Sequence, residues 1–279
     1  MRGCFGGRPR RASTHSSRNL IRSVYNSEGV AMSSSNVPDH RILHISDTRL
    51  LTGGSGENID CSDAVARLLD EVEEIDDRPE ALALTGTLPV GYHHLAPFRS
   101  AVERASERAD IQVIWGMGDH GDGATSDEFD DEVHDVNGLR LIAVNSNVSG
   151  RLHGEIDESQ LSWLSAVLAV PAPHGSILVL HHPPVPTPDP LMEMSALANQ
   201  DALESAVADG DLRTILAGHL HYSTLCTFAG ASVSVAAASC YTQDVGIDWG
   251  STGQAHLVHT TGDRIVNTAV RLGKRPRPR

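Results

Sequence analysis

The chain has 279 residues, enough for one large domain or two small ones with a sizeable core. Its formal net charge is −14, and residues 32–270 alone hold 11 basic and 35 acidic residues, a net charge of −24. A body this acidic repels nucleic acid and anionic membrane surfaces, so neither is an expected partner of the folded part.

The two ends of the chain differ from this acidic body. Residues 1–38 are rich in arginine, serine and glycine and are predicted to be a disordered basic segment. Met32, which three serines follow, is an alternative start, so residues 1–31 are either translated or an over-extension of the reading frame. Residues 273–279 form a basic tail, which leaves residues 39–272 as the predicted domain.

Cysteine usage and hydropathy indicate a cytoplasmic protein. The four cysteines (Cys4, Cys61, Cys226 and Cys240) are scattered and contain no C-x-x-C pair. This spacing argues against a zinc knuckle or a disulfide framework and fits a reducing compartment. No apolar run approaches the roughly 20 residues that a membrane span needs. The basic N-terminus also lacks the apolar stretch of a secretory signal.

The body of the chain alternates between two kinds of apolar pattern. Short apolar runs predict strands, and apolar residues at helical spacing predict amphipathic helices. In chain order the predicted elements are strand 42–47, helix 64–75, strand 81–86, helix 95–109, strands 111–117 and 139–144, helix 159–168, strand 177–180, helix 202–208, and strands 214–217, 231–237, 256–259 and 264–270. This alternation predicts a layered α/β architecture.

Several predicted strands end in residues that can bind a metal ion. The strand at 214–217 leads into a His-x-His pair, His219 and His221, and the earlier strand ends carry Asp47, Asp119-His120 and His181. Each has an ordinary explanation by itself, such as an N-cap for Asp47 or a turn residue for His181. Because ligands of α/β folds gather at the carboxyl ends of strands, the repeated pattern favours one shared metal site.

The order of these segments resembles the calcineurin-like metallophosphoesterases. A closer likeness is to the class III cyclic-nucleotide phosphodiesterases of bacteria, above all the actinobacterial cAMP phosphodiesterases. It rests on the following stretches: His44-Ile45-Ser46-Asp47-Thr48, Leu84-Thr85-Gly86, Gly154-Glu155-Ile156, Gln160-Leu161-Ser162-Trp163-Leu164, His181-His182-Pro183-Pro184, Ala217-Gly218-His219-Leu220-His221-Tyr222-Ser223 and Cys240-Tyr241-Thr242-Gln243-Asp244. The resemblance implies a four-layer αββα sandwich, which in this family is often a homodimer.

The resemblance also implies a two-metal hydrolase site. In that family two metal ions share a carboxylate and a hydroxide that attacks phosphorus in line, and a histidine helps the leaving oxygen. Carried over by motif position, the ligands that this chain keeps are Asp47, His181, His219 and His221, and the catalytic histidine is His120.

Four motif positions depart from the family pattern. Arg49 replaces a ligand histidine, Thr87 replaces the bridging aspartate, Val90 replaces the acid that would orient His120, and Asp119 replaces an asparagine. The first metal site then keeps only Asp47 and His221 as ligands.

The second site keeps a carboxylate and two imidazoles, Asp119, His181 and His219, which are a workable ligand set for one Mn, Fe(II) or Zn ion. We therefore predict a mononuclear site there. A second hypothesis places the Arg49 guanidinium beside Asp47, in place of the charge of the first metal ion.

Three functions stay open at this level. The chain hydrolyses cyclic nucleotides or other small phosphodiesters with one metal ion, or it is a catalytically inactive relative that binds a nucleotide or a protein. The third alternative is a decaying gene product without a selected role. The expected pocket rim, with His153, Tyr222 and Tyr241, contains no specificity code that identifies the substrate.

Overall fold

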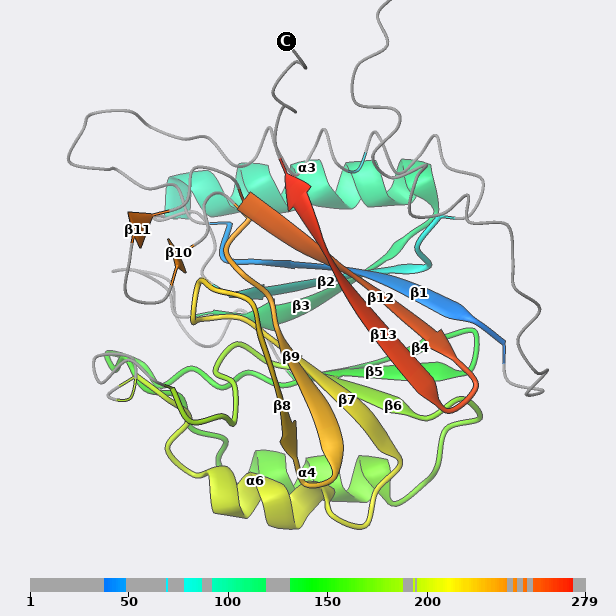
Figure 1. Cartoon of the computed structure of the whole chain (residues 1–279), viewed down its shortest axis with the longest axis vertical. Helices are drawn as coiled ribbons and strands as arrows, with labels where there is room; N and C mark the ends of the chain where they lie inside the picture. Colours follow the sequence, from blue (N-terminus) through cyan, green and yellow to red (C-terminus); the bar gives the residue numbers. More distant parts are fainter. Residues whose placement is uncertain are drawn as a thin grey trace, which may run out of the picture.

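The structure is a computed structural model that describes residues 38–48, 69, 78–86, 92–118, 131–187, 193, 195–239, 243–244, 248–249 and 253–272. Within these residues two large β-sheets lie face to face, with helices on their outer sides (Figure 1). Residues 1–37 and 273–279 lie outside the described residues, so the expectations for the two ends of the chain stay predictions.

The first sheet has five strands in the order β13-β12-β1-β2-β3. Its strands are β1 (His40–Ser46), β2 (Ala81–Gly86), β3 (Gln112–Met117), β12 (Gly253–Thr261) and β13 (Arg264–Leu272). β1, β2 and β3 are parallel, whereas the hairpin β12–β13 joins β1 in antiparallel register. β1 and β2 are buried on both faces because helix and second sheet cover them on opposite sides.

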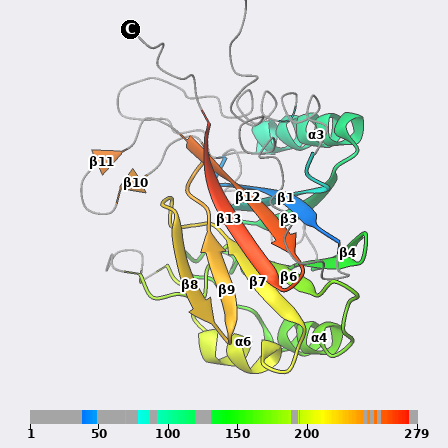
Figure 2. The same cartoon turned by 45° about the vertical axis from the view of Figure 1, so that its right-hand side comes forward.

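The second sheet has six strands in the order β4-β5-β6-β7-β9-β8. Its strands are β4 (Glu132–Val136), β5 (Leu139–Ala143), β6 (Ser176–Val179), β7 (Leu212–Ala217), β8 (Thr224–Phe228) and β9 (Ala231–Val235). β5, β6, β7 and β9 are parallel, and β4 and β8 close the edges in antiparallel pairing. Figure 2 shows the hairpin β12–β13 of the first sheet running alongside β7 and β9. A short ribbon of β10 (Gln243–Asp244) and β11 (Asp248–Trp249) completes the strands.

Three apolar clusters separate four layers. Helix α3 (Tyr92–Ala109) buries Phe98 and Val102 against the first sheet. The cluster between the two sheets contains Ile42, Ala83 and Ile114 from the first sheet and Leu141, Val179 and Leu216 from the second. Helices α4 (Glu158–Leu168) and α6 (Gln200–Val207) pack on the outer face of the second sheet. The predicted αββα sandwich is therefore confirmed.

The start of α4 follows from a local sequence signal. Asp157 caps the helix by accepting a hydrogen bond from the Gln160 amide, and the Gln160 side chain accepts one from the Asp157 amide. This reciprocal capping box satisfies two amides that would lack partners in the first turn. It explains why helix α4 begins at Glu158, directly after its cap residue Asp157.

The predicted elements correspond to the observed ones apart from several differences in number and bounds. The two-residue strands β10 and β11 are not among the predicted elements. Strands β4 and β8 were not predicted, because β4 is polar and both strands lie at sheet edges, where one strand face is open to water. Helix α3 begins at Tyr92, three residues earlier than predicted, and has Pro97 inside it. The predicted helix 64–75 lies outside the described residues except for Leu69, which is buried.

The parallel strands place several loops at one edge of the sandwich. β1, β6 and β7 all run toward this edge, so the residues that follow them meet across the two sheets. No helix in the described part of the chain is long and apolar enough to cross a membrane.

Candidate metal centre

The structure describes four of the predicted site residues and brings them together. Asp47 follows β1, His181 follows β6, and His219 and His221 follow β7. The other predicted residues lie outside the described residues: Arg49, Thr87, Val90, Asp119 and His120. The ligand set of Asp119, His181 and His219 and the Arg49–Asp47 pair therefore stay predictions.

The backbone at this edge adopts an uncommon conformation. Asp47, His219 and His221 have left-handed φ values of 49°, 71° and 59°. Residues with a Cβ atom rarely adopt this region, and such strain is concentrated at functional sites, where the surrounding structure holds it in place. The left-handed turns direct the side chains that follow β1 and β7 toward one another.

Asp47 lies at the junction between the sheets with its side chain 1% exposed. Its Oδ2 accepts hydrogen bonds from Ser46 Oγ at 2.6 Å and from the His219 amide at 3.0 Å, and His221 Nε2 lies 3.8 Å from its Oδ1. Gly86 and Gly218 leave the space that this arrangement needs. A Cβ atom on Gly86 would overlap the Asp47 carboxylate, and one on Gly218 would overlap Ser46 Oγ.

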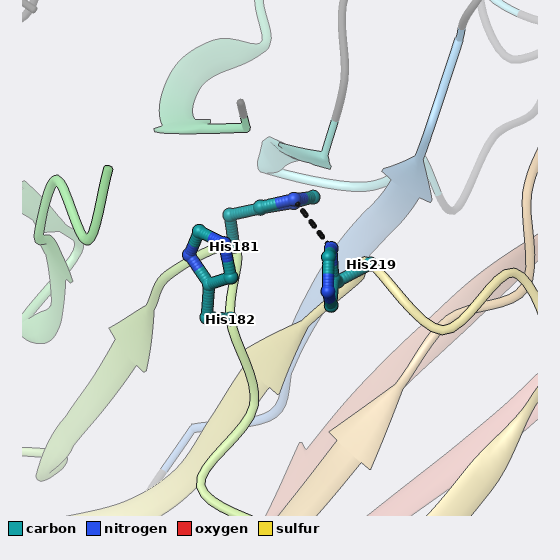
Figure 3. Close-up of side chains that lie close together, drawn as sticks. All are labelled: His181, His182 and His219. Atoms are coloured by element: carbon teal, nitrogen blue, oxygen red, sulfur yellow. Dashed lines mark hydrogen bonds between the residues drawn. The ribbon is translucent and has the colours of Figure 1, made fainter. Parts of the chain in front are cut away.

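His181 and His219 face each other through ring nitrogens. Nε2 of His181 lies 3.0 Å from Nδ1 of His219, with the ring planes at 79° (Figure 3). His181 is fully buried and His219 is 8% exposed. The other nitrogen of His219, Nε2, lies 3.0 Å from Ser195 Oγ.

A third buried histidine, His182, packs against both of these rings, with centroid separations of 4.5 Å to His181 and 4.7 Å to His219. Its Nε2 lies 3.3 Å from the Leu152 carbonyl oxygen, which can only accept, so Nε2 carries the proton. Its Nδ1 lies 2.9 Å from Ser146 Oγ and accepts from that hydroxyl. Both nitrogens of His182 are thus held by the protein, which indicates a supporting side chain.

Sequence reasoning did not assign His182 or Ser195 to the site. The adjacent histidines after β6 were a visible signal for His182, but nothing in the sequence indicated that its ring lies beside the other two. Ser195 is far from His219 along the chain, and its position follows only from the folded loop that contains it.

The donor groups fit a divalent metal ion. Nitrogen atoms of His181, His182 and His219 lie within 4.8 Å of one another. Because both nitrogens of His182 are held by the protein, the candidate ligands among them are the facing nitrogens of His181 and His219. Two facing nitrogens 3.0 Å apart can both bind one ion at the usual metal–nitrogen distance of about 2.0–2.1 Å. Imidazoles beside a buried carboxylate suit Zn, Mn or Fe(II).

Two more histidines lie beneath the site and are neutral. Burial, together with the nearby His256, lowers the pKa of His44 to about 3, and burial lowers the pKa of His256 to about 4. His44 Nε2 is hydrogen bonded to Thr85 Oγ1 at 2.8 Å, and His256 Nε2 to Ser223 Oγ at 2.9 Å. Thr85 directly precedes Gly86, and Ser223 follows His221 by two residues, so both hydroxyl groups belong to segments that continue into the site. The pair therefore contributes hydrogen bonds without positive charge.

Known proteins are similar to this chain in sequence and in fold. The calcineurin-like phosphoesterase family matches residues 40–223. A probable cyclic nucleotide phosphodiesterase of Rhodococcus erythropolis is 42% identical over 257 residues, covering 85% of each chain. A cAMP/cGMP dual specificity phosphodiesterase of Mycobacterium tuberculosis is 40% identical over 259 residues, covering 85% of this chain and 80% of that protein.

Solved structures provide evidence on the fold alone, because their identities are low. GAP50, the anchor in the inner membrane complex of Plasmodium, is 10% identical with a TM-score of 0.56, covering 85% of this chain and 90% of that chain. PhoD is 10% identical with a TM-score of 0.51, covering 82% and 65%. With the family match and the two relatives, these findings show that the chain belongs to the calcineurin-like phosphoesterase family.

Proposed function

We propose that this chain hydrolyses a 3′,5′-cyclic nucleotide, or a similar small phosphodiester, with water activated by one divalent ion. The observation that carries the proposal is the pair of facing nitrogens on His181 and His219, beside the buried carboxylate of Asp47. The relatives from Rhodococcus and Mycobacterium, whose names state cyclic-nucleotide phosphodiesterase activity, support this substrate class. We place the enzyme in the cytoplasm, where cyclic nucleotides are made and degraded, and expect a homodimer.

In this proposal His181 and His219 hold the ion, with Asp119 as the third ligand. A bound divalent ion lowers the pKa of its water and stabilises negative charge on phosphoryl oxygens. The water would lose a proton to solvent, its oxygen would form a bond to phosphorus while the phosphorus–O3′ bond breaks, and the leaving O3′ would take a proton. We assign that proton to His120, because it stands at the motif position of the histidine that helps the leaving oxygen in the family that this chain resembles.

Asp47 supplies negative charge at the other side of the centre. Its carboxylate is fixed by Ser46 Oγ and the His219 amide and lies near His221, so it is oriented before any ligand arrives. In our proposal the Arg49 guanidinium pairs with Asp47 and replaces the charge of the first metal ion of the family. Such a pair retains positive charge near the phosphate but cannot generate a hydroxide.

The replacements at Arg49, Thr87 and Val90 predict slow turnover. Loss of one electrostatic partner in such a site commonly costs about 10²–10³-fold in rate. The same replacements favour a second candidate function, a catalytically inactive relative that binds a nucleotide. The two candidates differ in turnover, not in fold.

Turnover distinguishes the candidates. The full chain is assayed for cAMP and for a generic aryl phosphodiester with added Mn²⁺, beside the double variant Thr87→Asp/Arg49→His. The proposal predicts measurable wild-type hydrolysis that the His219→Ala variant loses. A wild-type rate at background, with activity only in the double variant, contradicts the enzyme proposal. Nucleotide binding by calorimetry in that case supports the second candidate.

A further inference from the structure

The segment that contains Ser195 lies outside both sheets but is firmly anchored. The Gly154 amide donates to the Ala196 carbonyl at 3.2 Å, and the Ala198 amide donates to the Gly154 carbonyl at 2.8 Å. Gly154 and Leu197 form an isolated parallel bridge, and Leu197 is 2% exposed. Ser195 itself is 8% exposed. Its hydroxyl therefore has a fixed position beside the site.

The two ring nitrogens of His219 face different partners. Nδ1 lies 3.0 Å from His181 Nε2, and Nε2 lies 3.0 Å from Ser195 Oγ. The 3.0 Å approach of His219 Nδ1 to His181 Nε2 brings these two nitrogens within reach of a common ion, so we assign the shared ion to this pair. His219 can offer Nδ1 only as the tautomer that carries its proton on Nε2.

We infer that Ser195 is a positioning residue that selects this tautomer of His219. In this tautomer the Ser195 hydroxyl oxygen accepts the proton on Nε2, and the lone pair of Nδ1 is directed toward His181. Ring orientation and tautomer are the properties that outer hydrogen bonds impose on ligand histidines. The inference deepens the proposed function, because it concerns how the same centre holds its ion.

The same anchored segment also supports the neighbouring histidine. Gly154 lies directly against the His182 ring, where a Cβ atom would overlap ring atoms. The Leu152 carbonyl and Ser146 Oγ hold the two nitrogens of that ring. Residues 146–154 and 195–198 thus form one unit, which we call the clamp. Residues 146–154 of the clamp hold the His182 ring, and Ser195 of the clamp contacts His219. The Gly154–Ile156 motif, which supplies no metal ligand, thereby has a role in positioning the histidines.

The arrangement makes the two facing histidines unequal. With the His219 proton on Nε2, His181 Nε2 donates to His219 Nδ1 in the metal-free protein. Ion binding then requires a tautomer change at His181 alone, whereas His219 is already prepared. Outer partners of ligand histidines are commonly worth about 10–100-fold in metal affinity. We expect an effect of this size from the loss of the Ser195 hydroxyl.

The test uses the full-length chain, stripped of metal, in four forms: wild type, Ser195→Ala, Ser195→Thr and Ser205→Ala. Ser205 lies on α6, where its hydroxyl donates to the Asp201 carbonyl on the exposed surface, so it is a matched serine control. Zn²⁺ affinity is measured by calorimetry. The tautomer of His219 is read from its ¹⁵N shifts at one fixed pH, with a His219→Gln variant for assignment and circular dichroism as a check on folding.

We expect the Ser195→Ala variant to bind Zn²⁺ about 10–100-fold more weakly and to lose the preference for the proton on Nε2. Ser195→Thr should restore both properties, and Ser205→Ala should match the wild type. Wild-type affinity together with an unchanged tautomer in folded Ser195→Ala overturns the inference. If the wild type takes up no Zn²⁺, the proposed function fails, and the tautomer measurement alone decides the role of Ser195.

Discussion

Two pairs of facing histidines lie at opposite ends of the parallel strands in the described part of the chain. At the carboxyl edge, His181 Nε2 and His219 Nδ1 are 3.0 Å apart. At the amino end, His40 Nε2 and His174 Nδ1 are 2.8 Å apart, with His40 at the start of β1 and His174 just before β6. A short nitrogen–nitrogen distance alone therefore does not distinguish a metal centre from a structural contact.

The surroundings of the two pairs differ. The N–H group at Nδ1 of His40 donates a hydrogen bond to Glu80 Oε2 at 2.7 Å. Glu80, His40 and His174 are therefore connected by hydrogen bonds that join the two sheets. At the other edge a buried carboxylate and a third buried imidazole lie beside the pair, and His219 and the neighbouring His221 both have left-handed backbone. What separates a candidate centre from a structural pair is the number of donor groups that converge on it.

The largest expected effect is on metal binding. His181→Ala or His219→Ala should weaken Zn²⁺ or Mn²⁺ binding by more than about 10²-fold, because each removes a ligand. His174→Ala, the matched change at the amino end, should leave metal binding at the wild-type level. Calorimetry on the three variants measures both effects. Equal loss in all three variants would contradict the contrast between the two ends.

The second prediction concerns acid stability and contrasts two histidines of β1. His40 faces a carboxylate, whereas His44 faces the Thr85 hydroxyl and, like His256, has a strongly lowered pKa, about 3 for His44 and about 4 for His256. Below about pH 6.5 the unfolded chain binds protons that the folded chain does not, so stability is full above that pH and falls toward pH 4.

Within that window, His44 and His256 should each lower the free energy of unfolding by about 1.4 kcal/mol for every unit by which the pH falls. Urea unfolding at pH 7, 6 and 5 measures how the free energy of unfolding changes with pH. His44→Gln should reduce this slope by the contribution of one bound proton. An unchanged slope in His44→Gln would show that His44 is not neutral in the folded protein.

The third prediction compares two glycines, one at each end. A Cβ on Gly218 would overlap Ser46 Oγ and lie 3.0 Å from Asp47 Oδ2, so Gly218→Ala should cost about 1–3 kcal/mol and also weaken metal binding. Gly138 has φ +91° and lies against the His174 ring, so Gly138→Ala should cost about 1–2 kcal/mol through its backbone and leave metal binding intact. Thermal unfolding and metal titration separate the two outcomes.

The smallest expected effect is at the amino-end pair. His40→Gln should cost about 1–2 kcal/mol of unfolding free energy, because it breaks the bonds to Glu80 and His174. Metal affinity should not change. Weaker metal binding in this variant would mean that the two ends are coupled through β1.

The fold was predictable from the sequence where burial imposes a clear period. β1, β2, β6 and β7 contain short apolar runs that are followed by glycine or ligand-type residues, so their ends predicted that Asp47, His181 and His219 would lie at one edge. The polar edge strand β4 carries no such signal. The roles of His182 and Ser195 depend on hydrogen bonds between segments distant in sequence, which no local pattern encodes.

The metal content of the gently purified wild-type chain tests the central claim most directly. With Thr87 and Arg49 in place of a shared aspartate and a histidine, we predict about one tightly held divalent ion per chain, bound at His181 and His219. A value near two per chain would contradict the single-ion centre. A chain that holds none, even after exposure to Mn²⁺ and Zn²⁺, would contradict the metal centre itself.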